Sequence, residues 1–364
     1  MARATVEWER RPALPPTHYV HPAIYTDPEI FKAEQEQIFA KAWYLACHQS
    51  EVPAPNDYRT YQHPAGNARH LTCIFHAWAF NTRGDCIEIT REKQGYGDRL
   101  SKADYGLHEV KTEVGFGGFV YVNLDDSAGP LAEFIGHALD GMLKCIEAEP
   151  LEIFHYYRAV VDTNFKFWHD TNSEFYHDYM HYHNRQTSML QPSYWEREYV
   201  PFPNGHAQVG DQIVKYEAYE GFTGRELSFP GLEKNGWKMV DLFPGFTYNL
   251  RGSALRIDTV LPLGPTKTAI EYRGLGLTSD GPADRAQRVR DYNTIWGPFG
   301  RNLHEDLMGV MGQGRRLGRG QTFILHAREE GNKIHDEIGM RHYYAEWSRR
   351  MGRVASDPYR ELER

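Results

Sequence analysis

Hydrophobic and polar residues alternate with two different periods along this chain. Over residues 27–43 the apolar positions recur every three or four residues, the spacing of an amphipathic helix, and Asp27 followed by Pro28 suits its first turn. Over residues 44–124 the apolar runs are short and separated by Gly, Pro and Asn, which is typical of β-strands and turns. We therefore expect a helix that leads into a β-rich segment.

The strand pattern is clearest in residues 72–80, 85–90 and 116–123, and the Asn-Thr-Arg-Gly turn at 81–84 predicts a hairpin between the first two. Further on, residues 246–277 predict antiparallel strands with a Pro-Leu-Gly-Pro turn at 262–265. Helical patterns return over 284–311 and 336–351. This order predicts an α+β fold in which a small all-β unit is inserted in a larger domain with an antiparallel sheet.

Composition narrows the function without identifying it. Lys and Arg number 41 and Asp and Glu 49, a formal charge of −8, so the chain has no electrostatic reason to bind nucleic acid or an anionic membrane. The longest apolar stretch, residues 115–124, is far shorter than the roughly 20 residues that cross a bilayer. The first residues show no export signal, so we expect a cytoplasmic protein without disulfides among its four cysteines.

Four of the 18 histidines fall within residues 169–183. On a helix His177 and His181 would lie one turn apart and could bind one metal ion, with Glu174 on the same face. Two imidazoles and a carboxylate from elsewhere form the facial triad of non-haem Fe(II) oxygenases, which leaves positions open for O₂ and substrate. An isolated His pair at this spacing is, however, more often an ordinary helix face.

The residues around this pair resemble the iron-binding segment of Rieske ring-hydroxylating oxygenase α subunits. In that family an Asn-Trp-Lys precedes an acidic residue and two histidines, and here residues 164–166 are Asn-Phe-Lys. The resemblance implies His177 and His181 as iron ligands. Many members separate the two histidines by four residues, which would put Tyr182 at the second position, and His183 is a further alternative.

The resemblance also implies a third ligand and a bridging residue. The segment at 296–300, Trp-Gly-Pro-Phe-Gly, is similar to one that precedes the family's Asp ligand, which implies Asp306, with Glu305 as its competitor. An acidic residue between the two metal centres hydrogen-bonds an iron ligand and a cluster His. By position it is Glu174, between His177 and His76 of the partner subunit.

The β-rich segment resembles the family's Rieske domain. Cys73 and His76 stand in a Cys-x-x-His box that is followed by Ala77 where the family usually has Gly. A Rieske [2Fe–2S] cluster needs two Cys and two His, and the family's first box, Cys-x-His, is missing between residues 51 and 71. Compared with the family, about 25 to 30 residues are absent near residues 61–67. We favour a shortened version of an intact protein over a true variant that has lost its cluster, but in either case Cys73 and His76 alone cannot hold one.

The resemblance as a whole implies an N-terminal helical segment (1–43), a truncated Rieske-like domain (44–126) and a helix-grip catalytic domain (127–364). It implies an oxygenase that inserts oxygen from O₂ into an aromatic or related small organic substrate at a mononuclear Fe(II), as a mono- or dioxygenase. Electrons would come from NAD(P)H through a reductase, with or without a ferredoxin, and a Rieske cluster. The expected assembly is a trimer, with or without a β subunit.

The substrate itself is left open by the sequence. Four aromatic residues are candidates for lining a pocket, although each is as readily explained by core packing: Phe167, Phe175, Tyr176 and Phe246. Two rival interpretations remain. One is an oxygenase that uses only the mononuclear iron, and the other is a helix-grip ligand- or metal-binding protein without oxygenase activity.

Overall fold

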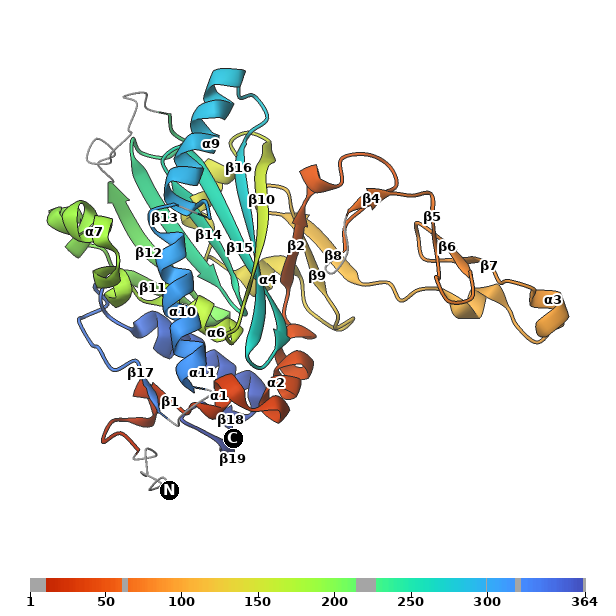
Figure 1. Ribbon diagram of the computed structural model, residues 1–364, viewed down its shortest axis with the longest axis horizontal. Coiled ribbons are helices and arrows are strands. Elements are labelled where there is room, and N and C mark those ends of the chain that lie inside the picture. Colours follow the sequence, from red (N-terminus) through yellow and green to blue (C-terminus); the bar gives the residue numbers. More distant parts are fainter. Residues whose placement is uncertain (1–10, 61–64, 214–226, 299, 318–321, 363–364) are drawn as a thin grey trace, which may run out of the picture.

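The computed structural model describes residues 11–60, 65–213, 227–298, 300–317 and 322–362. A body of helices packed on a large sheet carries a narrow arm that projects to one side (Figure 1). The arm contains the β-rich segment. Among the described residues, no helix combines the length and the apolar character needed to cross a membrane.

The body is built on an antiparallel sheet of seven described strands. In spatial order they are β10 (Leu151–Val161), β16 (Lys267–Leu277), β15 (Ala254–Gly264), β14 (Phe246–Arg251), β13 (Gly236–Leu242), β12 (His206–Ile213) and β11 (Tyr199–Phe202). The longer helices of the body are α6 (Phe165–Ser173), α9 (Pro282–Trp296), α10 (Leu303–Leu317) and α11 (Ile338–Met351). Antiparallel strands and helices together form the expected α+β class.

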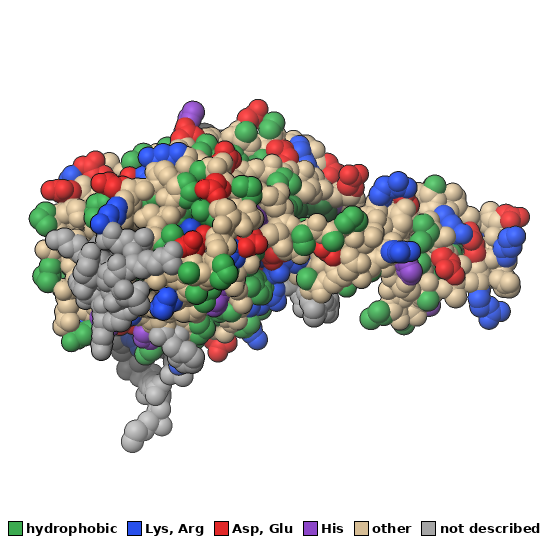
Figure 2. Space-filling model, turned by 90° about the horizontal axis from the view of Figure 1, so that it is seen from above, with side chains coloured by type: hydrophobic (Ala, Val, Ile, Leu, Met, Phe, Trp, Pro, Cys, Tyr) green, Lys and Arg blue, Asp and Glu red, His purple; other side chains and the backbone are tan. Residues whose placement is uncertain are grey.

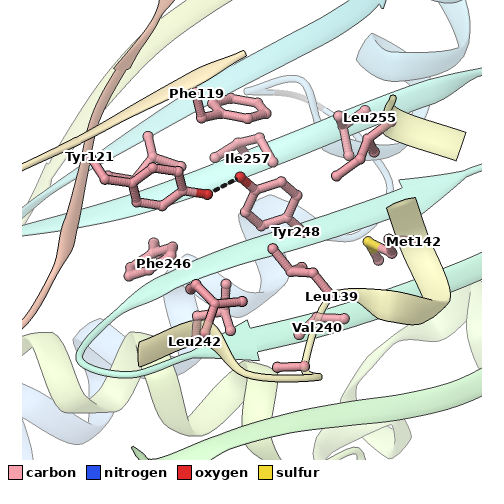
Figure 3. Packing of buried hydrophobic residues seen from close by; sticks show 14 of the residues in the cluster. Phe119, Tyr121, Leu139, Met142, Val240, Leu242, Phe246, Tyr248, Leu255 and Ile257 are labelled. Carbon is pink, nitrogen blue, oxygen red and sulfur yellow. Dashed lines mark hydrogen bonds between the residues drawn. The ribbon is translucent and has the colours of Figure 1, made fainter. Parts of the chain in front are cut away.

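The two faces of this sheet differ in chemistry because successive side chains on a strand point to opposite sides. On one face, Leu250 and Ile257 are buried in a cluster with Phe119 of the arm and Leu139 of a preceding turn (Figure 3). In the same cluster the hydroxyl groups of Tyr121 and Tyr248 are hydrogen-bonded. The short helices α4 (Leu131–Ile135) and α5 (Asp140–Ile146) add to this apolar layer.

The opposite face is lined by polar residues and is covered by the four longer helices. Strands β14 and β15 present to it, at alternate positions, Thr247, Asn249, Arg251, Arg256 and Asp258. All five are buried. Buried polar groups must be paired with one another or with a ligand, so this face is the part of the sheet most suited to a functional site.

Helix α6 crosses this polar face and is fixed at its first turn. The side chain of Asn164 caps it by accepting the backbone N–H of Lys166 at 3.0 Å. The ammonium of Lys166 is fully buried and lies 2.7 Å from Glu34 on α2 (Pro28–Glu34), which also accepts the indole N–H of Trp347 from α11. This buried cluster therefore ties α6 to both α2 and α11.

The arm consists of small sheets. Strands β2 (Tyr44–His48), β9 (Phe119–Asn123) and β8 (Lys111–Gly115) form one, and β5 (His70–Thr72), β6 (Ala79–Asn81) and β7 (Cys86–Glu88) form another. Figure 2 shows the outer part of the arm standing clear of the body, with hydrophobic side chains exposed among charged ones. The sheet of β2, β9 and β8, by contrast, packs on the body through Phe119 and Tyr121. The remaining elements of the chain are short: η1 (Pro16–His18), β1 (Tyr19–Val20), α1 (Ala23–Thr26), η3 (Gln49–Glu51), β3 (Asp57–Tyr58), β4 (Gly66–Asn67), α3 (Glu92–Gly95), η4 (Lys102–Tyr105), η5 (Tyr176–Met180), α7 (Tyr182–Gln186), η6 (Ser188–Leu190), α8 (Pro192–Trp195), η7 (Pro203–Gly205), β17 (Ile324–Leu325), β18 (Arg353–Val354) and β19 (Asp357–Glu361).

Several predicted elements have other bounds. The helix expected over 27–43 is capped by Asp27 as predicted, but it is α2 followed by a π-helical turn, η2 (Gln35–Phe39). The strand expected over 72–80 is split by a turn at Cys73–Ala77, and the one expected over 116–123 begins at Phe119 because residues 116–118 have positive φ. The helix expected over 284–311 is two helices, since Gly297 and Pro298 end the first.

Candidate metal centre and substrate cavity

The two histidines follow directly on helix α6. The chain leaves α6 at Glu174 and forms one 3₁₀ turn, η5, and His181 caps that turn at its C-terminal end. The expected α-helix is therefore wrong here, yet the rings still meet, with centroids 5.5 Å apart at 73°. A 3₁₀ turn has a tighter winding than an α-helix, and the extended backbone at His181 turns its ring back toward His177.

Asp306, in the first turn of α10, faces both rings. Its Oδ1 lies 3.0 Å from Nε2 of His181 and 3.6 Å from Nε2 of His177. This oxygen is buried and accepts no hydrogen bond of normal geometry from any described residue. Two imidazole nitrogens and one carboxylate oxygen that point at a common position, with the oxygen left without a donor, suit a metal ion.

Glu305, the neighbouring carboxylate, has a different position. Its Oε2 lies 2.6 Å from Nδ1 of His181, on the side of the ring away from Asp306. A carboxylate at this nitrogen accepts its proton and leaves Nε2 free as a ligand atom. Asp306 thus has the geometry of a ligand, and Glu305 that of a residue that orients one.

Asp178 is a further carboxylate near the pair, since one of its oxygens lies within 4.8 Å of nitrogens of His177 and His181. Its own oxygens are already occupied, because Asn184 donates to Oδ1 at 3.0 Å and Tyr194 donates to Oδ2 at 2.8 Å. It is also farther than Asp306 from Nε2 of His181, at 3.8 Å. We therefore regard Asp306 as the better third ligand.

Glu174 contacts His177 in the manner expected of a bridging residue. Its Oε1 lies 2.8 Å from Nδ1 of His177, and its Oε2 accepts the backbone N–H of the same residue at 3.0 Å. The side chain also lines a second cavity, of about 270 Å³, on the side of His177 and Asp306 that faces α10 and α11. The expected contact of Glu174 with His76 of the partner subunit stays a prediction.

The two alternatives for the second His position lie elsewhere. Tyr182 and His183 begin helix α7, where Tyr182 is exposed and its ring packs edge-on against that of His183. No described contact joins either side chain to Asp306. Of the three candidates only His181 reaches the carboxylate.

Negative charge is concentrated around the two imidazoles. Burial by itself lowers the pKa of His177, but the carboxylates of Glu174 and Asp306 raise it to about 10. Burial likewise lowers the pKa of His181, and Asp306 and Asp178 raise it to about 9. A site that stabilises positive charge this strongly also favours a divalent cation, which would displace the imidazole protons.

Cys73 and His76 lie in the arm, between β5 and β6, far along the chain from this site. The turn that carries them is closed by the backbone bond from Cys73 N–H to Trp78 C=O at 2.8 Å, and Ala77 has a positive φ of 58°. Backbone N–H groups of residues 75 and 76 donate to the Cys73 sulfur and lower the pKa of its thiol. Cys73 is exposed, as are the intervening Ile74 and Phe75.

These two residues do not meet the ligand requirement of a [2Fe–2S] cluster. Among the described residues, the group of three or more potential ligands that lies close enough to hold a metal is the one at His177 and His181, and none includes Cys73. The other cysteines, Cys47, Cys86 and Cys145, are buried. The expected gap near residues 61–67 includes residues 61–64, which lie outside the described residues.

A cavity of about 60 Å³ opens beside the two histidines and Asp306. Its wall contains His177, His181 and Asp306 together with polar residues from four strand positions and from the helices and turns around them, and a few rings. The polar residues are Thr171, Asn172, Asp178, Asn184, Ser188, Tyr194, Gln212, Asn249, Arg251, Arg256 and Asn302. Sequence reasoning missed this polar wall, although its signal was present as polar residues at every second position of the strands within 246–277.

The four aromatic residues predicted to line the pocket lie in different places. Phe175 lines the small cavity, whereas Phe167 and Tyr176 line the second cavity beside Glu174. Phe246 is wrong, because it points to the apolar face of the sheet and packs against Tyr44 and Tyr121. The strand alternation decides this, since Phe246 shares its face with Tyr248 and Leu250.

Solved structures share this architecture. The chain superposes on naphthalene 1,2-dioxygenase from Rhodococcus sp. with a TM-score of 0.76 at 19% identity, covering 92% of this chain and 94% of that one. A quaternary ammonium Rieske monooxygenase gives a TM-score of 0.73 at 17% identity, covering 92% and 96%. At this identity the likeness shows the fold: that of Rieske oxygenase α subunits.

Sequence comparison shows the family. The family model for the ring hydroxylating alpha subunit (catalytic domain) matches residues 148–353. The methanesulfonate monooxygenase hydroxylase subunit alpha of Methylosulfonomonas methylovora is 48% identical, covering 98% of this chain and 97% of that protein. The 2-aminobenzenesulfonate 2,3-dioxygenase subunit alpha of an Alcaligenes species is 38% identical, covering 98% and 99%. This chain belongs to the α subunits of the Rieske ring-hydroxylating oxygenases, and it is an oxygenase subunit of that type.

The alignments also bear on the missing segment. The first extends over 401 positions, although the chain has only 364 residues, so at least 37 positions are filled by the relative alone. The second extends over 392 positions, at least 28 more than the chain. Both relatives therefore contain internal residues that this chain lacks, in numbers large enough to include a Cys-x-His box.

Proposed function

We propose that this chain binds a single Fe(II) through His177, His181 and Asp306 and oxygenates a small organic substrate there. One observation carries the assignment: Asp306 Oδ1 is buried without a hydrogen-bond donor while it faces Nε2 of both imidazoles. Iron bound there would supply O₂ activation, with the overall balance R–H + O₂ + 2 e⁻ + 2 H⁺ → R–OH + H₂O for a monooxygenation.

The protein groups around the iron have separate tasks. Glu305 holds His181 through Nδ1 and Glu174 holds His177 through Nδ1, so that each ring presents Nε2 to the metal. Three ligands on one side leave the cavity side open for O₂ and substrate. The small cavity keeps the substrate close to this open side and largely away from water.

Glu174 is a positioning residue. It would connect the iron site of this chain to a histidine of a neighbouring subunit. It contacts His177 on one side and lines the second cavity on the other, so a histidine from the partner subunit could reach it. An assembly in which each active site uses a neighbour's arm requires a closed ring. We propose a trimer in which a reductase or ferredoxin would deliver electrons from NAD(P)H once a complete cluster is present.

The residues of this chain do not provide a complete binding site for the family's [2Fe–2S] cluster. Cys73 and His76 offer two of the four ligands, and the described residues offer no others within reach. We infer that the chain of 364 residues does not assemble the cluster and cannot by itself receive electrons through it, whereas the iron site is complete.

The substrate proposed is a small organic sulfonate. Both relatives that align over nearly the whole chain carry a sulfonate in the name of their substrate. The size of the cavity favours a substrate of few atoms, because a cavity that accepts benzene measures about 150 Å³ and this one measures about 60 Å³.

The test is a metal analysis of protein purified without oxygen after iron and sulfide have been supplied. We expect about one iron per chain, no acid-labile sulfide and no visible absorption band of a cluster. Asp306→Ala should lose the iron, while Asp178→Asn should retain it. Iron retained by Asp306→Ala would overturn the ligand assignment. About three irons and two sulfides per chain would overturn the inference about the cluster, and zinc or no metal would favour a ligand-binding protein without oxygenase activity.

A further inference from the structure

The wall of the small cavity opposite the metal ligands is rich in positive charge. Arg251 at the end of β14 and Arg256 on β15 both line the cavity, with 8% and 4% of their surface exposed. Arg197, 3% exposed, lies behind the wall, with its guanidinium 3.9 Å above the ring of Trp237. Three buried guanidinium groups within one side of a sheet need compensating negative charge.

For Arg197 the carboxylates of the described residues do not supply it. Asp258 pairs with Arg256 at 2.8 Å. Of the two carboxylates that line the cavity, Asp306 faces the histidines and Asp178 accepts hydrogen bonds from Asn184 and Tyr194. Arg197 has no carboxylate within 4 Å among the described residues, and its Nη2 is buried without an acceptor. Its remaining bonds go to neutral oxygens.

One of those neutral oxygens orients a second donor. Nη1 of Arg197 donates to Oε1 of Gln212 at 3.1 Å. Because a guanidinium can only donate, the amide must turn its oxygen to Arg197 and its NH₂ group the other way. Gln212 lines the cavity, is 2% exposed, and its Nε2 has no acceptor among the described residues. The strand is irregular just before it, between Val209 and Gln212, as is common beside active sites.

Arg256 supplies a comparable donor from the other side. Its Nη2 is used by Asp258, but its Nε is buried and has no acceptor among the described residues. The cavity wall therefore contains N–H groups from a neutral amide and from a cation that are left for a bound molecule to satisfy. A ligand that matches them has several acceptor oxygens, no donors and a negative charge.

We propose that this wall is a sulfonate subsite, in which Gln212 Nε2 and Arg256 Nε donate to sulfonate oxygens and Arg251 adds positive charge. The proposal rests on the proposed function and adds which residues recognise the substrate. The carboxylates around the histidines repel the anionic group, so its oxygens face the sheet and its carbon faces His177, His181 and Asp306. The three oxygens of a sulfonate match these donors better than a neutral group of the same shape. Gln212 and Arg256 are thus specificity-determining residues.

The test compares methanesulfonate with dimethyl sulfone, which has nearly the same shape but a methyl group in place of the charged oxygen. Both are titrated calorimetrically, without oxygen, into the full chain loaded with Fe(II). We expect methanesulfonate to bind at least about 10-fold more tightly, since a hydrogen bond to a charged group contributes about 10- to 100-fold in affinity. Equal affinities for the two compounds would overturn the proposal.

Variants then separate the residues from general packing. Gln212→Leu should weaken methanesulfonate binding by about 10-fold and leave dimethyl sulfone unchanged, and Gln212→Glu should abolish methanesulfonate binding by repulsion. Arg256→Lys keeps the charge but lacks Nε–H, so it should weaken binding as well. Gln94→Leu, an exposed position in the arm, is the matched control. Methanesulfonate affinity that is unchanged in Gln212→Leu would exclude the subsite.

The same titrations distinguish this proposal from the iron assignment. If the chain binds about one iron but not methanesulfonate, the sulfonate subsite is wrong and the iron site stands. If methanesulfonate binds in a Gln212-dependent way to protein that takes up no iron, the subsite stands and the proposed function is wrong.

Discussion

Replacing Glu305 by Ala distinguishes the roles of the two carboxylates at the start of α10. In the wild type Glu305 Oε2 lies 2.6 Å from Nδ1 of His181, whereas Asp306 lies on the Nε2 side of the same ring. Removing Glu305 leaves all three proposed ligands in place but frees the His181 ring and its tautomer. The variant should therefore bind Fe(II) more weakly without losing the site.

The size of this effect follows from the position of Glu305. Loss of a carboxylate that orients a metal-binding histidine typically costs 10- to 100-fold in metal affinity, or about 1.4 to 2.7 kcal/mol. The Glu305 side chain is 21% exposed, so water can replace part of its hydrogen bond, and we expect the lower half of that range. Glu305→Gln, which retains an acceptor, should lose less than Glu305→Ala.

The assay is a competition titration of Fe(II) against a chromophoric chelator without oxygen, for the wild type, Glu305→Ala, Glu305→Gln and Asp306→Ala. Asp306→Ala should have the weakest binding of the four. If Glu305→Ala binds iron as tightly as the wild type, the orienting role is refuted. If it binds more weakly than Asp306→Ala, Glu305 is the ligand and the assignment of the two carboxylates must be exchanged.

Three further predictions concern stability. Lys166→Met should lower the free energy of unfolding by about 3 to 5 kcal/mol, because it leaves Glu34 buried without its cation. In urea unfolding, the double variant Glu34→Leu/Lys166→Met should recover most of the loss. A double variant as unstable as the single one would contradict this. Burial lowers the pKa of His206 to about 4, although Nε2–H donates to Phe134 C=O at 2.8 Å. Its contribution to stability is thus complete above its ordinary pKa of about 6.5 and is lost as the pH falls toward 4, so unfolding should become easier by ~2 kcal/mol between pH 7 and pH 5; a His206→Gln variant with the wild-type pH dependence would speak against this. Finally, Ala77→Gly should remove the strain of the positive φ of 58° at this position and stabilise the turn by about 1 kcal/mol. Amide hydrogen exchange around Cys73 should then be slower. Unchanged or faster exchange would show that the turn is unstrained.

Local signals predicted the elements that depend on local chemistry. Asp27 caps the first helix as expected, the hairpin at 81–84 is present, and the strands of 246–277 are antiparallel. The elements that failed depend on neighbours. Residues 72–80 have strand-like composition throughout, but the chain turns at Cys73–Ala77, where a single backbone conformation at Ala77 interrupts the strand.

The metal site was predicted from the sequence in part. The spacing of His177 and His181 and the resemblance around them pointed to the pair, yet the helix assumed between them is a 3₁₀ turn. The distinction between Asp306 and Glu305 could not be made from the sequence, because the two are adjacent and chemically alike. It depends on which carboxylate α10 directs at Nε2 and which at Nδ1. The assignment of ligands remains a prediction for the metal analysis to test.

The sequence by itself determined the family, the fold class and the absence of a first Cys-x-His box, because these depend only on the order and spacing of residues. Only the tertiary structure decided what surrounds the proposed iron site. Gln212, Arg251 and Arg256 come from three strands, with the first and the last 44 positions apart, and have no motif in common. They share a cavity because strand pairing brings β12, β14 and β15 into one sheet and alternation turns these side chains to one face.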